Sequence, residues 1–148
     1  MPPQNSCRVV VGRLMEIDIA AGYRTVDEIE AITRKMREHL EAAPPQTRFV
    51  IAADWRACRV LTQVVAERAA AMFLVGNPMI ERSAILHAPD QATSVLQVMR
   101  LTQEAESPHR RVFTSPHEME RWLSEVLTHP EVERLRAMLY RRGSERGV

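Results

Sequence analysis

Three short apolar runs, each followed by a stretch with helical spacing, constrain the fold of this chain more than any other feature. The runs occupy residues 48–54, 83–87 and 110–114. Short apolar strands that alternate with amphipathic helices are typical of α/β proteins, in which the core strands pair in parallel. The sequence therefore predicts an α/β fold with a mixed, mainly parallel sheet of four or five strands flanked by helices.

The length and charge of the chain limit the classes of protein to which it can belong. Its 148 residues predict a single domain that buries about two thirds of its unfolded surface. The net charge of +1 argues against partners chosen mainly by charge, so we expect no nucleic-acid binding. Lys35 is the only lysine, and the many arginines fit either a GC-rich genome or a surface built for bidentate anion contacts.

Neither the N-terminus nor the cysteines point to secretion, a membrane or a metal. The first residues contain no apolar signal region, and no apolar run is long enough to span a bilayer. Cys7 and Cys58 are too few for a disulfide framework and lack the spacing of metal ligands. We therefore expect a soluble cytoplasmic protein without a membrane span or a metal site.

The N-terminal part predicts a flexible lead-in over residues 1–7, followed by two strand-like stretches. Residues 9–11 are β-branched, and residues 15–19 alternate apolar and acidic side chains, which is typical of a strand buried on one face. Gly12 lies between them, so this part is either a hairpin or one long strand bent by a bulge. The one-sided pattern of residues 15–19 favours a sheet edge or an antiparallel strand over a central parallel one.

Capping residues and apolar stripes predict four helices and a last amphipathic segment. Thr25 and Glu28 form a capping box at the start of the first helix. Asp90 is a candidate N-cap of the third helix, and Ser115 with Glu118 forms a second capping box at the fourth. The residues expected to face the core are Val26, Ile29, Ile32, Met36 and Leu40 in the first helix, Leu61, Val64, Val65, Ala69, Met72 and Phe73 in the second, Ala92, Val95, Leu96 and Met99 in the third, Met119, Trp122, Leu123 and Val126 in the fourth, and Val132, Leu135, Met138 and Leu139 in residues 131–142.

Polar and aromatic side chains follow the predicted parallel strands, at the sheet edge where α/β proteins usually bind ligands. The candidate ligand-binding residues are Asp54, Trp55, Arg56, His87 and Ser115. Each has an ordinary structural alternative, which is, in the same order, a strand-end turn, a lid on the core, a local ion pair, a strand-end imidazole and a helix cap.

The motifs of several large enzyme classes are missing from the sequence. It contains no glycine-rich dinucleotide or Walker-type loop, and no Gly-x-Ser-x-Gly elbow. The five histidines do not have the spacing of metal ligands. This pattern is unusual for a dedicated enzyme and ordinary for a binding module, so we expect no cofactor.

The order of elements resembles the STAS superfamily, the domain of anti-sigma-factor antagonists, and more closely its divergent SpoIIAA-like bacterial branch. A strand pair and a Thr-capped helix are followed by the buried strand at 49–54, a helix, the strand at 84–86 and a closing unit over 112–123. The resemblance covers residues 8–127 and implies a module that docks partners or small ligands without catalysis. Classical members carry a phosphorylated Asp-Ser pair at the second helix, where this chain has Thr62 and no such pair, so no functional residue is carried over.

We therefore expect a non-catalytic regulatory module that acts through protein–protein docking. The alternative is a small-molecule-binding protein or enzyme that takes a small apolar or anionic ligand at the carboxyl ends of the parallel strands. That alternative requires the first four candidate residues to line one concavity with apolar walls.

Residues 128–148 extend past the α/β unit as an amphipathic helix with a tail that we expect to fray from Arg141. The apolar stripe of this helix must be buried, either on its own sheet or against the same helix of a second copy. We favour a two-fold homodimer. The strand at 15–19 offers a second route to a dimer if it lies at an edge, with Glu16 and Asp18 as guards.

Overall fold

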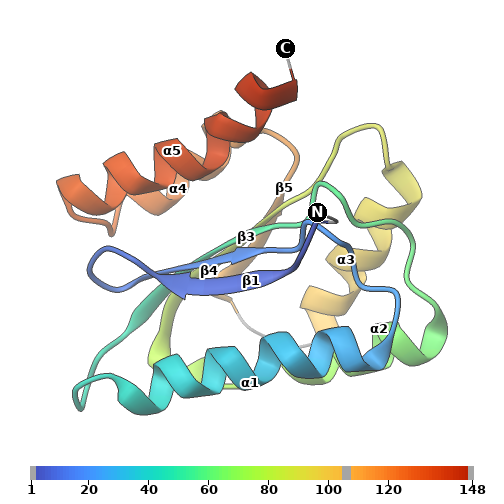
Figure 1. Ribbon diagram of the computed structural model, residues 1–148, viewed down its shortest axis with the longest axis horizontal. Helices are drawn as coiled ribbons and strands as arrows, with labels where there is room; N and C mark the ends of the chain where they lie inside the picture. Colours follow the sequence, from blue (N-terminus) through green and yellow to red (C-terminus); the bar gives the residue numbers. More distant parts are fainter. Residues whose placement is uncertain (1–2, 105–107, 147–148) are drawn as a thin grey trace.

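The computed structural model describes residues 3–104 and 108–146, and all of these belong to one layered unit (Figure 1). In chain order its elements are β1 (Ser6–Val9), β2 (Leu14–Asp18), α1 (Val26–Ala42), β3 (Phe49–Asp54), α2 (Gln63–Met72), the 3₁₀ turn η1 (Asn77–Met79), β4 (Ile80–Leu86), α3 (Ala92–Glu104), β5 (Arg110–Phe113), α4 (Pro116–Ser124) and α5 (His129–Arg146).

The five strands form one mixed sheet in the order β1-β2-β3-β4-β5. β1 pairs antiparallel with β2, and the other three pairings are parallel. Because successive parallel strands lie side by side and their crossovers are right-handed, the connecting helices α1, α2 and α3 all lie on one face. The predicted α/β fold with a mixed, mainly parallel sheet is confirmed.

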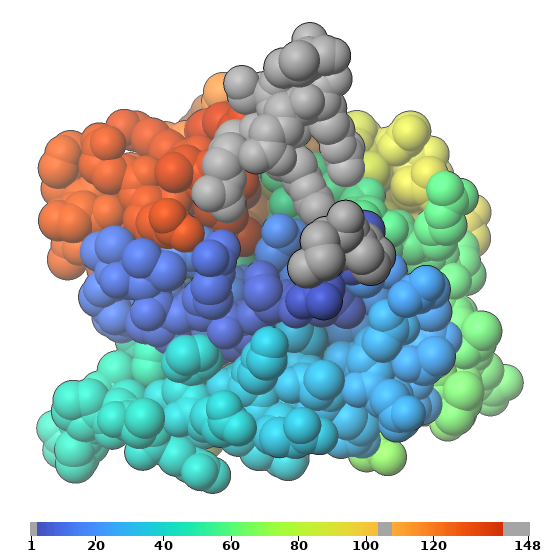
Figure 2. Space-filling model, in the orientation of Figure 1, coloured from blue at the N-terminus to red at the C-terminus, as the bar shows by residue number. Residues whose placement is uncertain are grey.

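The N-terminal strands form a hairpin, which settles the choice that the sequence left open. Gly12 adopts a left-handed conformation at φ 55° in the turn, where a side chain is disfavoured. β1 starts at Ser6, inside the expected lead-in, because its residues pair with β2 from Ser6 onward. Figure 2 shows this hairpin between α5 on one side and α1 on the other.

The position predicted for the strand at residues 15–19 is wrong in one respect. β2 is no edge strand, but it does pair antiparallel with β1, as the second alternative predicted, and it runs parallel to β3 on its other side. Its alternating acids do not mark a solvent face, because Glu16 is buried under α5 and paired there with Arg134. The edges of the sheet are β1 and β5.

The sheet carries a separate hydrophobic core on each face. The larger core lies under α1, α2 and α3 and contains the aromatic residues Tyr23, Trp55 and Phe73. The smaller core lies under α4 and α5, where Leu135 and Leu139 of α5 pack on Val50 and Leu86 of the sheet. The stripe of residues 131–142 is therefore buried within its own chain, and α5 continues to Arg146, into the part expected to fray.

On two helices, α2 and α3, apolar residues that the sequence predicted to be buried are exposed to solvent. On α3 the buried apolar residues are Val98 and Leu101, whereas Leu96 is 67% and Met99 43% exposed. On α2, Val64 is 60% exposed. The third helix begins at Ala92, with the carbonyl of Gln91 accepting its first hydrogen bond, so Asp90 is not its N-cap.

Candidate functional site

Asp54 ends β3 and points to the face covered by α5. Its carboxylate accepts hydrogen bonds from Arg56 Nε at 3.0 Å and Nη2 at 2.9 Å, and from the Arg56 backbone N–H at 3.0 Å. The same guanidinium donates to the Leu139 carbonyl of α5 at 3.1 Å. Since Asp54 is 3% exposed and Arg56 is half-buried, this pair fastens the end of β3 to α5.

Trp55 points the other way, into the core under α1–α3. Its ring meets Tyr23 edge to face, with centroids 5.2 Å apart, and lies tilted against Phe73 at 5.8 Å. The indole is 1% exposed. Trp55 therefore covers and fills the core, as the structural alternative for this residue predicts.

His87 follows β4 and is fully buried against α3. Its Nδ1 accepts the Ala88 backbone N–H at 2.8 Å, and its Nε2 lies 2.8 Å from Ser94 Oγ. Since Nδ1 is an acceptor, the ring carries its proton on Nε2 and donates it to Ser94. Burial lowers the pKa of His87 below its ordinary value, so the imidazole is neutral.

Ser115 caps α4 as its position before Pro116 predicts. Its hydroxyl accepts the Glu118 backbone N–H at 3.3 Å. The side chain is half-buried at the end of β5. A hydroxyl used in this way stabilises the first turn of the helix.

The structure thus divides the sequence candidates between the two faces of the sheet. Asp54 and Arg56 are joined under α5, whereas Trp55 and His87 belong to the side covered by α1–α3. The hydroxyl of Ser115 is already engaged as the N-cap of α4. These five residues do not line one common concavity.

A different buried residue, Arg110, is the most unusual charged group in the described part of the chain. It starts β5 and is 8% exposed, under α2. Its guanidinium carbon lies 4.8 Å from the centre of the Phe73 ring. Nε reaches Ser83 Oγ only at 3.5 Å and Nη2 reaches Asn77 Oδ1 only at 3.4 Å, while Nη1 has no hydrogen-bond partner.

Among the side chains that the structure describes, which exclude those of residues 104–107 and 141–148, no carboxylate forms an ion pair with Arg110. Burial alone lowers its pKa to about 10. A buried cation without an anion is costly, since nothing offsets the loss of its hydration.

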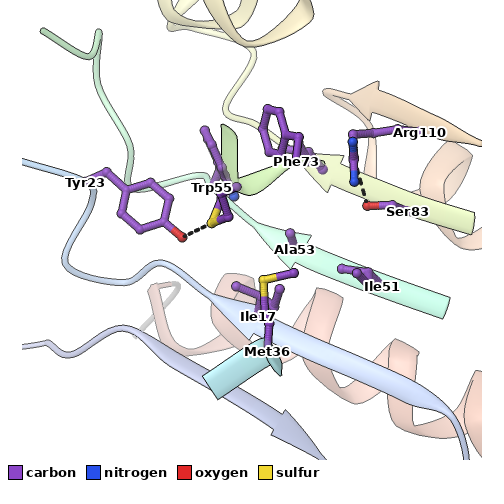
Figure 3. Close-up of a pocket in the computed structure, with 11 residues that line it drawn as sticks. Ile17, Tyr23, Met36, Ile51, Ala53, Trp55, Phe73, Ser83 and Arg110 are labelled. Carbon is purple, nitrogen blue, oxygen red and sulfur yellow. Dashed lines mark hydrogen bonds between the residues drawn. The ribbon is translucent and has the colours of Figure 1, made fainter. Parts of the chain in front are cut away.

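Arg110 borders a small cavity in the core under α1–α3 (Figure 3). The cavity has a volume of about 20 Å³. Figure 3 shows Trp55 and Phe73 between Tyr23 at one end and the Arg110–Ser83 pair at the other. The remaining wall is apolar and includes Met36 and Ile51.

Sequence reasoning treated Arg110 only as part of a strand, although one signal pointed to it. Side chains alternate between the two faces of a strand. Val112 packs on the core under α1–α3, so Arg110, two residues earlier, shares that face, and Arg111 takes the other. Two adjacent arginines at the start of a short strand therefore place one of them under the helices.

The second notable feature is a groove between α2 and α3. It has a volume of about 570 Å³. Gln97 of α3 joins the two sides, since it accepts the Leu61 N–H at 2.7 Å and donates to the Leu61 carbonyl at 2.9 Å. The groove is lined by Leu61, Gln63, Ala66, Glu67, Gln97, Arg100 and Leu101.

Four exposed apolar side chains lie on or next to these two helices: Val60, Val64, Leu96 and Met99. Leu96 lies one helical turn before Arg100, which lines the groove. Val64 borders a shallower hollow on the α1 side of α2, and Val60 borders another beside Tyr23. We call the groove and these four residues the α2–α3 surface. Large apolar side chains gathered on one face of a protein mark interaction sites more often than scattered ones do.

Within residues 3–104 and 108–146, no group of three or more His, Cys, Asp or Glu side chains is arranged to hold a metal ion. No helix in that part of the chain is both long enough and apolar enough to cross a membrane. Cys7 and Cys58 are buried and are not joined in a disulfide, and burial raises the pKa of Cys7 to about 12.

The fold makes this chain an α/β protein, in which one five-stranded mixed sheet is covered by helices on both faces. No family model, no curated protein and no solved structure matches it.

Proposed function

We propose that this protein is a non-catalytic interaction module that docks a partner protein on its α2–α3 surface. The observation that supports this is the exposure of Leu96, Met99 and Val64, at 67%, 43% and 60%. Large apolar side chains of helices usually face a core, and here they face solvent on two neighbouring helices. The resemblance to the STAS superfamily favours a regulatory role for such docking.

The partner that fits this surface is a protein presenting an amphipathic helix. A groove between two helices that expose apolar side chains nearby can accept the apolar face of a third helix. Glu67 and Arg100 line the same groove, so polar contacts at its walls can fix the orientation of the partner. A site at the strand ends has less support, because its candidate residues lie on opposite faces of the sheet.

The test is affinity capture from the source cells, with quantitative mass spectrometry, using four baits. These are the wild-type chain, Leu96→Glu, Val64→Glu and the control Val10→Glu. Val10 is 52% exposed on the β1–β2 turn, away from α2 and α3, so this variant adds the same charge elsewhere.

A partner that binds the wild type and Val10→Glu, and is lost with Leu96→Glu and Val64→Glu, is the expected result. A partner retained by all four baits would place docking elsewhere. A measured turnover on any metabolite by the purified chain would contradict a non-catalytic role.

The apolar stripe of residues 131–142 no longer supports a dimer, because α5 buries this stripe on its own sheet. Sedimentation of the wild type and of Leu96→Glu tests whether the α2–α3 surface binds a second copy instead. Dimerisation of the wild type that is lost in the variant would make the partner another copy of this chain.

A further inference from the structure

We propose that the cavity beside Arg110 is a binding site for a small monovalent anion, a halide or the carboxylate of a compact acid such as formate. The inference rests on the geometry of a buried guanidinium and the space next to it. It is independent of docking on the α2–α3 surface.

The first step is the state of the guanidinium. Nη1 of Arg110 has no hydrogen-bond partner, and Nε and Nη2 reach oxygen atoms only at 3.5 and 3.4 Å. Arginine carries five N–H donors and no acceptor, so most of this capacity is unused. Buried donors in native proteins are almost always satisfied, and a missing partner calls for a ligand or an ordered water.

The second step is the charge of that ligand. The face of the guanidinium is covered by the Phe73 ring, which supplies a weak attraction and no hydrogen-bond acceptor. The other polar side chains that line the cavity, Ser83, Tyr23 and Trp55, carry hydroxyl or indole N–H groups and no charge. A water would satisfy one N–H but leave the positive charge uncompensated, whereas an anion provides both the acceptor and the charge.

The third step is the size and valence of the ligand. A volume of about 20 Å³ exceeds the roughly 10–15 Å³ that one water needs, so the cavity can admit an ion somewhat larger than a water but not a ligand of many atoms. A single guanidinium compensates one negative charge. Phosphate and sulfate are too large and too highly charged, so the site selects compact monoanions.

Two hydroxyl groups at the cavity can form hydrogen bonds to such an ion, so that no second positively charged side chain is needed. Ser83 Oγ lies on the β4 side of the guanidinium and can donate its proton to the ion. Tyr23 Oη, at the other end, contacts Met72 Sδ at 3.8 Å, a weak interaction that it can exchange for a stronger acceptor. The methionines at the wall are flexible side chains that can adjust to an ion.

The experiment is thermal unfolding of the full chain at constant ionic strength, with sodium gluconate replaced stepwise by sodium bromide or sodium formate. Gluconate is too large for the cavity and serves as the reference. Because an ion that binds only the folded state stabilises it, we expect Tm to rise by about 3–5 °C at ten times the dissociation constant. A rise in Tm with only one of the two anions shows whether the site prefers a halide or a carboxylate.

Arg110→Met should remove the anion dependence, and Arg111→Met should retain it. Arg111 neighbours Arg110 on the same strand but is exposed on the other face. Equal Tm values in bromide, formate and gluconate for the wild type would overturn the proposal, as would an anion response that survives in Arg110→Met.

A second measurement on the unaltered protein does not depend on any variant folding. Crystals grown in sodium bromide should show an anomalous scattering peak at hydrogen-bond distance from Arg110 Nη1. Absence of that peak at bromide concentrations that raise Tm would place the stabilising ion elsewhere and overturn the assignment.

Discussion

The two faces of the sheet differ in whether their buried charged side chains have a partner of opposite charge. Under α4 and α5, Glu16 is paired with Arg134 at 2.7 and 3.0 Å, and Asp54 with Arg56 at 2.9 and 3.0 Å. Under α1–α3, Arg110 is buried without a carboxylate partner among the described residues. The compensated charges hold α5 on the sheet, whereas the guanidinium of Arg110 lacks a counter-ion among the described side chains.

The physical reason for the difference is the cost of removing a charge from water. A buried ion pair with good geometry recovers most of that cost through attraction and hydrogen bonds, whereas a lone buried ion does not. Removing one partner on the α5 side should therefore destabilise the protein. Removing the lone cation on the other side should stabilise it.

The largest expected effect is that of Arg134→Met. It leaves Glu16, which is 4% exposed, without its cation, and we expect the free energy of unfolding to fall by about 3 kcal/mol in urea titrations. The double variant Glu16→Met with Arg134→Met should lose less than the single one, because it removes both charges. Equal losses in the two variants would show that packing, and not charge, holds α5.

The next effect is that of Gly12→Ala in the hairpin turn. Gly12 has φ 55°, and a Cβ there would lie 2.3 Å from Glu131 Oε2, the oxygen that accepts the Arg13 N–H at 2.8 Å. We expect a loss of about 2 kcal/mol from backbone strain and displacement of the carboxylate. Val10→Ala, at an exposed position of the same turn, should stay within about 0.5 kcal/mol of the wild type. A Gly12→Ala protein as stable as Val10→Ala would contradict this account.

Arg110→Met should act in the opposite direction. In sodium gluconate, where no compact anion is present, we expect this variant to unfold at a higher urea concentration, with a gain of about 1–2 kcal/mol. Addition of bromide should narrow the gap, since it stabilises only the wild type. A destabilised Arg110→Met in gluconate would show that stacking on Phe73 outweighs the cost of the buried charge.

The smallest effect is a dependence on pH from His87. Burial lowers the pKa of this imidazole, so between that pKa and 6.5 the unfolded chain binds more protons than the folded one. Stability should therefore fall as the pH drops below about 6.5, with a slope of at most about 1.4 kcal/mol per pH unit. Urea midpoints between pH 5 and 7.5 measure it. His87→Gln should flatten this part of the curve, and His129→Gln, at an 83% exposed side chain, should leave it unchanged.

The local features of the fold could be predicted from sequence where neighbouring residues carry the signal. The Thr25–Glu28 capping box and the buried face of α1 are confirmed, because both depend on residues three and four positions apart. α3 shows where this fails. It has apolar residues on two faces, and the docking of the helix against α2 and β5 decided that Val98 faces the core and Leu96 faces solvent.

The candidate site was less predictable for the same reason. The strand ends were correctly located, but the alternation of side chains sent Asp54 and Trp55 to opposite faces. Arg110 was overlooked because its unusual feature is the absence of a carboxylate near it, and such an absence exists only once the chain has folded.

What the sequence by itself determined is the set of elements and their class: apolar strands that alternate with capped amphipathic helices form an α/β sheet whatever their other contacts. Tertiary structure decided which charges are compensated. Glu16 and Arg134 are 118 residues apart, and only the return of α5 across β2 makes the pattern of β2 compatible with burial. No described carboxylate pairs with Arg110, because electrostatic pairing depends on distances in space that local sequence does not encode.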